Sequence, residues 1–342
     1  MKNKKTEIAF FVFGLAIFVY LVSRFGVGQI TANIAKSGWS LLYALLVWLV
    51  IYVLNTFSWK LLLDKEGKGV SLLRLFMVNV SGFAIDTITP VVALGGEPYK
   101  VKALAGVMGA RKSLSAVLVF RMVHVLGHML MLLVGIFAAL YFLSLPVSLV
   151  WVLVVVGAVT MFIVVLILSG LRSGVFHRIQ AVLGKIKFLS RLSEALRKHE
   201  TDFHEMDRVV TYVYRNHQAK FLLAVILEFL CRACMGVELY LILHGTGVEI
   251  SMVSALFLYV AYSIIINVVF FIPLNLGVRE GGLYLGLESL ALAPVLGIYL
   301  GVMIRIREFI WILLGLLLII PLTRMSGKSV VYPEENPTGT LP

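Results

Sequence analysis

The sequence has few charged residues and very few cysteines. Charged side chains make up 14% of its 342 residues and hydrophobic side chains 60%, whereas a soluble domain carries about 25% charged residues. This composition excludes an ordinary soluble protein and indicates an integral membrane protein. The two cysteines, Cys231 and Cys234, share one apolar run. Their placement excludes a disulfide framework or a zinc ribbon and favours packing over redox chemistry.

Catalytic and nucleotide-binding signatures are also missing. The sequence contains no GxSxG element, no GxxxxGK loop and no Cys-His-Asp arrangement. We therefore expect a transporter rather than an enzyme, with no cofactor and no ATPase domain. His124 and His128 are four residues apart on one helix face, but no HExxH pattern surrounds them. For these histidines we expect hydrogen bonds at a helix interface and no metal site.

The net charge of +12 comes from basic residues that lie in short segments between the apolar runs. This distribution is typical of membrane topology rather than nucleic-acid binding, so no nucleic-acid partner is expected. With the N-terminus inside, most of these Lys and Arg residues fall on the cytoplasmic side, and Arg24 and Lys36 fall outside. The positive-inside rule then predicts a multi-pass protein of the cell (inner) membrane with both termini in the cytoplasm.

Six apolar runs have the length of about 20 residues that a spanning helix needs. They cover residues 7–23, 39–63, 113–143, 146–169, 221–244 and 295–322. The first run follows three lysines and lacks a small-residue cleavage site, so we expect an uncleaved anchor.

Two further apolar stretches, residues 72–109 and 250–293, are interrupted by proline, glycine and charge. The interruptions contain Pro90, Gly95, Gly96 and Glu97 in the first stretch, and Pro273, Gly277, Arg279 and Glu280 in the second. Proline ends a helix and glycine permits the chain to reverse, so each stretch is predicted to form a re-entrant helical hairpin. The alternative is that both stretches are pairs of fully crossing helices, with the interruptions as surface loops.

The predicted elements repeat along the chain. Residues 39–143 (repeat 1) and residues 219–322 (repeat 2) each contain a helix, a hairpin and a long helix, in opposite orientations. The predicted fold is therefore an all-α polytopic membrane protein with six full transmembrane helices plus two re-entrant broken-helix hairpins in an inverted repeat, an architecture of many secondary transporters. The other predicted parts are an N-terminal anchor (1–38), a linking helix with a basic cytoplasmic amphipathic loop (144–218) and a disordered tail (323–342).

Charged residues inside the apolar runs cost about 2.5 to 3.5 kcal/mol each at the bilayer centre and need a role. Free N–H groups and positive dipole ends of half-helices meet at the interruptions and attract an anion. We expect a lipid headgroup to contact Glu97, Arg121, Arg279, Glu280 and Arg305. The alternative is a closed salt-bridge network that fixes the two repeats together. Helical spacing also predicts local pairs between Glu228 and Arg232 and between Arg305 and Glu308.

At TPVVALGGEPYKVKAL and PLNLGVREG the chain resembles the lysylphosphatidylglycerol synthase transmembrane-domain family, the flippase half of the multiple peptide resistance factor. The resemblance runs from about residue 6 to residue 322. It implies that the chain moves a lipid, often an aminoacylated one, between leaflets. Fused members of the family carry a cytoplasmic domain that makes this lipid, for which the chain has no room. Where the family tends to have an acid three residues after the helix arginine, His124 follows Arg121, a departure that bears on headgroup preference.

We therefore expect a lipid flippase that acts on a phospholipid or lipid-linked headgroup, such as aminoacylated phosphatidylglycerol, by alternating access. The alternatives are a membrane enzyme acting on lipid headgroups, or a subunit that docks a separate lipid synthase through residues 171–218.

Overall fold

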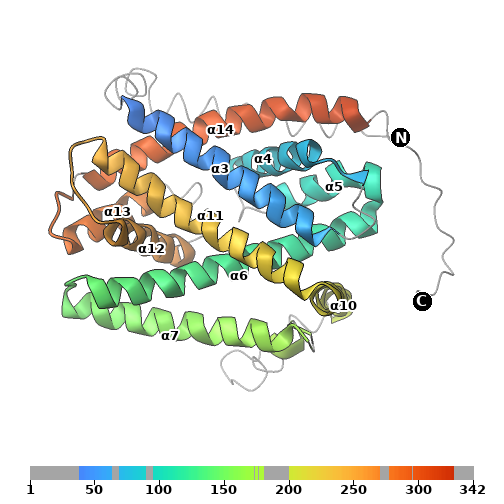
Figure 1. The fold of residues 1–342 in the computed structure, drawn as a ribbon, viewed down its shortest axis with the longest axis horizontal. Helices are drawn as coiled ribbons and strands as arrows, with labels where there is room; N and C mark the ends of the chain where they lie inside the picture. The colour runs from blue at the N-terminus through green and yellow to red at the C-terminus, as the bar shows by residue number, and fades with distance from the viewer. Residues whose placement is uncertain are drawn as a thin grey trace.

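The computed structural model describes residues 38–63, 69–89, 95–172, 174–175, 177–180, 200–269, 277–294 and 296–326. Within these ranges the chain forms helices and connecting turns, with no β-strand (Figure 1). The predicted anchor at 7–23, Pro90, Pro273 and most of the predicted tail lie outside them, as does most of the predicted amphipathic loop.

Five described helices have between 24 and 33 residues: α3 (Trp39–Leu62), α6 (Ala110–Phe142), α7 (Val147–Gly170), α11 (Gln218–His244) and α14 (Leu296–Ser326). Each coincides to within a few residues with one of the predicted apolar runs. By length and composition, α3, α6 and α7 can cross a membrane. Helices α11 and α14 are as long but carry charged side chains in their middle turns. The described part of the chain thus has the structure of an all-helical, multi-pass membrane protein.

Two helical hairpins occupy the stretches where the sequence predicts broken helices. The first hairpin consists of α4 (Leu72–Ile88) and α5 (Gly96–Met108), and the second of α12 (Met252–Val268) and α13 (Val278–Ser289). The second arms, with 13 and 12 residues, are shorter than the roughly 20 residues of a spanning helix. Figure 1 places the two hairpins toward opposite ends of the molecule.

The first arms of the two hairpins begin in the same way. A serine caps each first arm: Ser71 Oγ accepts from the N–H of Arg74 at 3.2 Å, and Ser251 Oγ from the N–H of Ser254 at 3.0 Å. A glycine precedes each second arm for a different reason. Gly277 has a φ of +76°, which favours glycine, whereas a Cβ on Gly95 would lie 2.3 Å from Thr89 Oγ1.

Residues 39–142 (first unit) and residues 218–326 (second unit) pack by the same scheme. Helices α3 and α11 lie against each other, and they are antiparallel because Ser40 lies beside Gly245 while Ser58 bonds to Ala224. The first arm of each hairpin packs on the long helix of the other unit, α4 on α14 and α12 on α6. The second arm packs on the long helix of its own unit, α5 on α6 and α13 on α14. Each contact between helices of the first and second units therefore has an equivalent in which the corresponding helices of the two units are interchanged.

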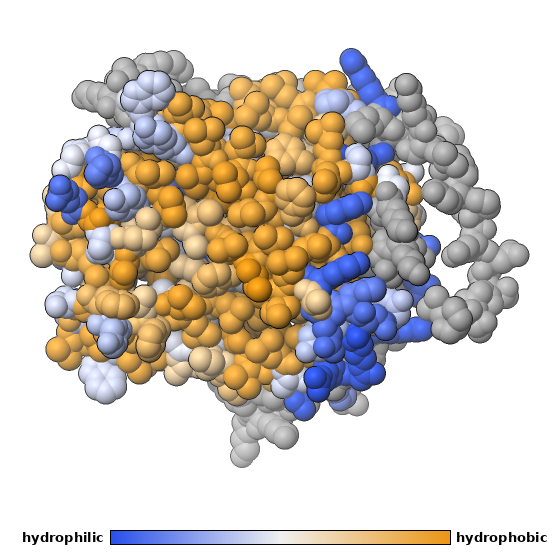
Figure 2. Space-filling model, in the orientation of Figure 1, coloured by the Kyte–Doolittle hydropathy of each residue, from blue (hydrophilic) through white to orange (hydrophobic). Residues whose placement is uncertain are grey.

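The surface is divided into an apolar region and a polar end. Figure 2 shows hydrophobic side chains over most of the visible face, and hydrophilic ones gathered at the end where α10 (Glu200–Asn216) lies. Helix α7 packs on α6 and exposes large apolar side chains along its length, among them Trp151, Val155 and Phe162. Such a surface is suited to lipid.

Candidate functional site

Each hairpin presents a glutamate on the first turn of its second arm, and the following long helix supplies an arginine to it. In the first unit, Arg121 Nη1 lies 3.2 Å from Glu97 Oε1. In the second unit, Arg305 Nε lies 2.6 Å from Glu280 Oε1 and Arg305 Nη2 3.1 Å from Glu280 Oε2. The structure thus brings four of the five predicted headgroup residues together as two equivalent ion pairs. From the sequence, these residues were expected to contact a headgroup, and their pairing with each other was not predicted.

The two ion pairs differ in exposure. The side chain of Arg121 is 50% exposed and that of Glu97 21%, and Glu97 Oε2 has no hydrogen-bond partner. Arg305 is 7% exposed and holds both oxygens of Glu280, whose side chain is 19% exposed; the difference between the pairs thus lies in the arginines. The backbone of Gly301 lies against Glu280, because a Cβ there would come within 2.5 Å of its Cγ. The Glu97–Arg121 pair can therefore accept a further polar group, whereas the Glu280–Arg305 pair is closed.

Two more ionisable side chains surround the first pair. Asp86 Oδ1, from α4, accepts the N–H of Gly96 at 2.7 Å. The chain's own carboxylate thus occupies a free N–H at the start of α5, where the sequence predicted an external anion. Lys100, one turn after Glu97, is buried, with its Nζ 6.0 Å from the ring centre of Trp59. Asp86 interacts electrostatically with Lys100, Glu97 and Arg121, so the first hairpin gathers two acids and two bases.

Arg279, the fifth predicted residue, bonds elsewhere. Its Nη1 lies 2.8 Å from Glu308 Oε1, and both side chains are nearly buried. Arg305 thus pairs with Glu280 and Glu308 with Arg279, so the local pair that helical spacing predicted between Arg305 and Glu308 is not the arrangement found. Arg279 instead fixes the second hairpin to α14.

A second closed ion pair joins three helices of the two units. Arg307 of α14 donates to both oxygens of Glu238 on α11, at 2.8 and 3.1 Å, and each side chain is 2% exposed. Trp48 of α3 donates its Nε1–H to Glu238 at 2.9 Å, and its ring centre lies 3.9 Å from the guanidinium carbon of Arg307. Both this ion pair and the Arg279–Glu308 pair lie within the second unit, and the link to the first unit here is the Trp48 hydrogen bond. The alternative, a salt-bridge network that fixes the two repeats together, stays a prediction.

The histidines of α6 form hydrogen bonds across helix interfaces, as the sequence predicts. His124 Nδ1 lies 2.8 Å from Glu228 Oε2 on α11, and His128 Nδ1 lies 3.0 Å from the hydroxyl of Tyr259 on α12. Asn55 of α3 donates to both oxygens of Glu228, at 2.9 and 3.0 Å. Glu228 was expected to pair with Arg232 one turn away, but its hydrogen bonds run to other helices.

Asn55 and Trp48 were not predicted as partners of the acidic residues. Both are uncharged, and their positions in an apolar helix do not by themselves indicate a hydrogen bond. Their position opposite the acidic residues of α11 was not visible without the packing of α3 on α11.

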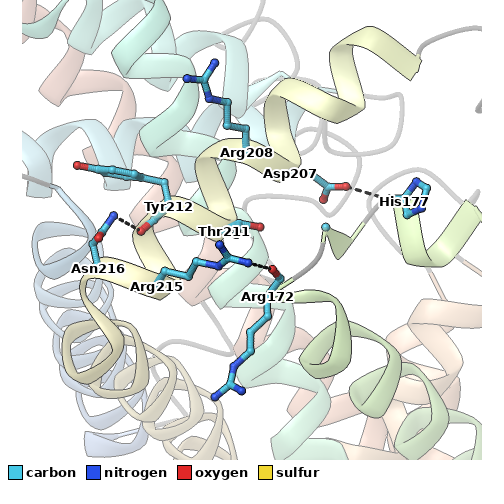
Figure 3. A pocket seen from close by; sticks show the side chains of 9 residues that line it. Arg172, His177, Asp207, Arg208, Thr211, Tyr212, Arg215 and Asn216 are labelled. Carbon is cyan, nitrogen blue, oxygen red and sulfur yellow. Dashed lines mark hydrogen bonds between the residues drawn. The ribbon is translucent and has the colours of Figure 1, made fainter. Parts of the chain in front are cut away.

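A separate, open pocket of about 730 Å³ lies at the end of α7, against α10 (Figure 3). Arginine, histidine, tyrosine, threonine, asparagine and aspartate side chains line it (Arg172, His177, Asp207, Arg208, Thr211, Tyr212, Arg215 and Asn216). Arg215 Nη2 donates to the carbonyl of Arg172 at 2.6 Å, and the buried Asp207 accepts the N–H of His177 at 2.9 Å. This basic pocket belongs to the segment that the sequence suggested for docking.

Comparison with known families gives a match over most of the chain. The family model described as the lysylphosphatidylglycerol synthase TM region matches residues 7–315. No curated protein and no solved structure gives a significant match to the chain.

Proposed function

Because the chain belongs to the family of the lysylphosphatidylglycerol synthase TM region, we propose that it is a flippase, which moves a phospholipid or lipid-linked headgroup between the leaflets of the cell membrane. It is a multi-pass membrane protein of a family related to lipid headgroups. In this proposal it is a transporter rather than an enzyme, both termini are cytoplasmic, and the two hairpins are re-entrant.

The observation that carries the proposal is the pair of equivalent glutamate–arginine sites in two units that pack alike. The sites lie on hairpins at opposite ends of the molecule, and one is open while the other is closed. A transporter with two inverted units changes access when the units exchange conformations. The headgroup would bind at Glu97 and Arg121 in this state, and at Glu280 and Arg305 in the state of opposite access.

The first site has the chemistry that a phosphate-bearing headgroup requires. Arg121 offers exposed N–H donors, which form strong charge-assisted hydrogen bonds with phosphate oxygens. The Oε2 of Glu97 is buried and has no hydrogen-bond partner, so an amine or hydroxyl of the headgroup would reach it only after a shift of the side chain. The acyl chains would stay in the lipid that surrounds the apolar helices. Arg279, bound to Glu308, would hold the second hairpin in place rather than touch the headgroup.

The test measures translocation of short-chain fluorescent lipids with different headgroups in vesicles that contain the purified protein. Arg121→Gln removes the guanidinium and keeps a polar side chain, and we expect translocation to fall at least about tenfold, the equivalent of one lost charged hydrogen bond. The matched control is Lys102→Gln, which removes an exposed cation from α5, the hairpin arm that packs on α6, and should leave the rate within about twofold. Equal rates for wild type and Arg121→Gln in folded protein would contradict the site assignment.

A second candidate, a docking subunit for a separate lipid synthase, is favoured by the basic pocket against α10. Its test is co-purification of the synthase with wild type and with an Arg208→Gln, Arg215→Gln variant. Loss of the partner with unchanged lipid translocation would assign this pocket to docking and leave the flippase site unaffected. Retention of the partner by the variant would contradict a docking role for the pocket.

A further inference from the structure

Glu228 is a fully buried carboxylate in the middle of α11, with hydrogen bonds to two other helices. Its side chain is 0% exposed. Asn55 of α3 donates to both oxygens, and the Nδ1 of His124 on α6 lies 2.8 Å from Oε2. The guanidinium of Arg232, one turn further along α11, contacts both nitrogens of the His124 ring. His124 thus lies between a carboxylate and an arginine.

These contacts define the protonation state of His124. Arginine carries a fixed positive charge, so a second proton on the ring would place two cations in contact. A carboxylate accepts, so the Nδ1 that faces Glu228 must carry the proton. The neutral ring, protonated at Nδ1 alone, is therefore the form that fits these neighbours, and Nε2 is free to take up a proton.

The other intramembrane carboxylates of the described residues have partners of a different kind. Four of them pair with arginine: Glu97, Glu238, Glu280 and Glu308. Arginine does not release its proton in proteins, so such a pair stays charged. The fifth, Asp86, bonds to a backbone amide. Within the described helices, Glu228 is thus the carboxylate bonded to a histidine, a side chain that can gain and lose a proton.

The His124–Glu228 pair also lies at a contact between the two units. Helix α6 belongs to the first unit and α11 to the second, and a Cβ on Gly127 would come within 2.6 Å of the Glu228 Cβ. On the same face of α6, Arg121 precedes His124 by three residues and holds Glu97, and His128 follows by four and bonds to Tyr259 of the second hairpin. One helix face therefore links both hairpins to the pair.

We propose that the His124–Glu228 pair is a proton-binding site that couples lipid translocation to a transmembrane proton gradient; this inference rests on the flippase proposal. A proton from water on one side binds Nε2 of His124 and makes it a donor. Two donors, Nε2–H and the Arg232 guanidinium, then face each other, so Arg232 must leave the ring while the Nδ1–H bond to Glu228 is kept. Loss of the proton to water on the other side restores the contact, and no other bond changes.

The charges that face the pair come from each side. Lys100 of α5, Arg121 and His128 of α6, and Arg232 of α11 all interact with it electrostatically. The thiol of Cys231 is the other titratable group close to it, and the contribution of α3 is the neutral amide of Asn55. Arg232 is the cation that contacts the ring, so its displacement is the structural consequence of proton binding.

The experiment uses vesicles that contain the full protein, fluorescent phosphatidylglycerol and a pH-sensitive dye, with and without an imposed pH difference. With one proton per lipid, a difference of about one pH unit changes the equilibrium ratio of lipid between leaflets about tenfold, and the dye reports accompanying proton movement. His124→Gln keeps an amide donor but cannot take up a proton, and Glu228→Gln removes the charge. Both variants are expected to lose the coupling. If they still exchange lipid, the ratio of lipid between the leaflets should not depend on the pH difference.

Two controls separate this site from its surroundings. His128→Gln removes a histidine from the same helix face, and Asp86→Asn removes the carboxylate that is not bonded to arginine. Both variants should respond to the gradient as wild type does.

A wild-type response in His124→Gln, or loss of the response in Asp86→Asn alone, would overturn the assignment. Lipid exchange by wild type that ignores the gradient would overturn the coupling and leave the flippase proposal standing. No exchange by wild type under any condition would overturn both. Size-exclusion elution identifies variants that do not fold.

Discussion

Replacement of Arg307 by methionine should destabilise the protein strongly, because it would leave a buried carboxylate unpaired. Glu238 is 2% exposed and receives two hydrogen bonds from Arg307 and one from Trp48. Arg307→Met removes two of the three bonds and the stacking on Trp48, while the methionine fills part of the space. Removal of one partner of a buried ion pair costs about 3 to 5 kcal/mol. Since about 1 kcal/mol corresponds to about 2 °C in large domains, we expect a midpoint lower by roughly 6 to 10 °C.

The assay is thermal unfolding in detergent, followed with a thiol-reactive fluorophore. Cys231 is buried on α11 and bonded to Asn55 and the carbonyl of Ile51, so it reacts once α11 separates from α3. Cys234→Ala removes the other thiol. Arg121→Met is the matched control, because an exposed ion pair contributes no more than about 1 kcal/mol. The double variant Arg307→Met, Glu238→Gln should recover most of the loss. Equal midpoints for Arg307→Met and Arg121→Met would refute the reasoning.

Three further predictions concern the hairpins. In a background without native cysteines, Arg121→Cys should react several-fold faster with a charged thiol reagent than Arg305→Cys, and equal rates would contradict the open and closed states of the two sites. Gly277→Ala should lower the unfolding midpoint by the equivalent of about 1 to 2 kcal/mol, since its φ of +76° strains a side chain; Gly281→Ala, where nothing lies near the added methyl group, is the control. Ser71→Ala and Ser251→Ala should each cost about 1 kcal/mol in the same assay through loss of a helix cap, and a neutral effect of both would contradict the capping.

The sequence predicted the long helices well because an apolar run has a clear length and clear ends. It also predicted that each of the two broken stretches forms a pair of helices, since proline, glycine and charge recur at nearly the same offsets in both. That these pairs are re-entrant stays a prediction. The spacing from Glu97 to Arg121 is nearly equal to that from Glu280 to Arg305, but it did not predict that these residues pair. The pairs form because the second arm of each hairpin packs on the following helix.

The partners of the other charged residues were not predicted either. Spacing of three or four residues suggested Glu228 with Arg232 and Arg305 with Glu308, but local pairs contribute only about 0.2 to 0.5 kcal/mol. Contacts between helices determined the outcome instead. Asn55 and His124 reach Glu228 from two other helices, and Glu280 reaches Arg305 from the second hairpin. Such partners depend on which helix faces meet, and one sequence does not carry this information.

The unequal state of two equivalent sites follows from their surroundings rather than from the paired residues, which are the same in both. Beside Glu280, the bare backbone of Gly301 lets the carboxylate approach α14 closely enough for both oxygens to bond Arg305. Beside Glu97, the carboxylate of Asp86 and the ammonium of Lys100 supply competing charges. Arg121 therefore holds one oxygen and stays exposed. Two units that pack alike but hold their sites in different states are what alternating access requires, so the asymmetry supports transport more strongly than either site alone.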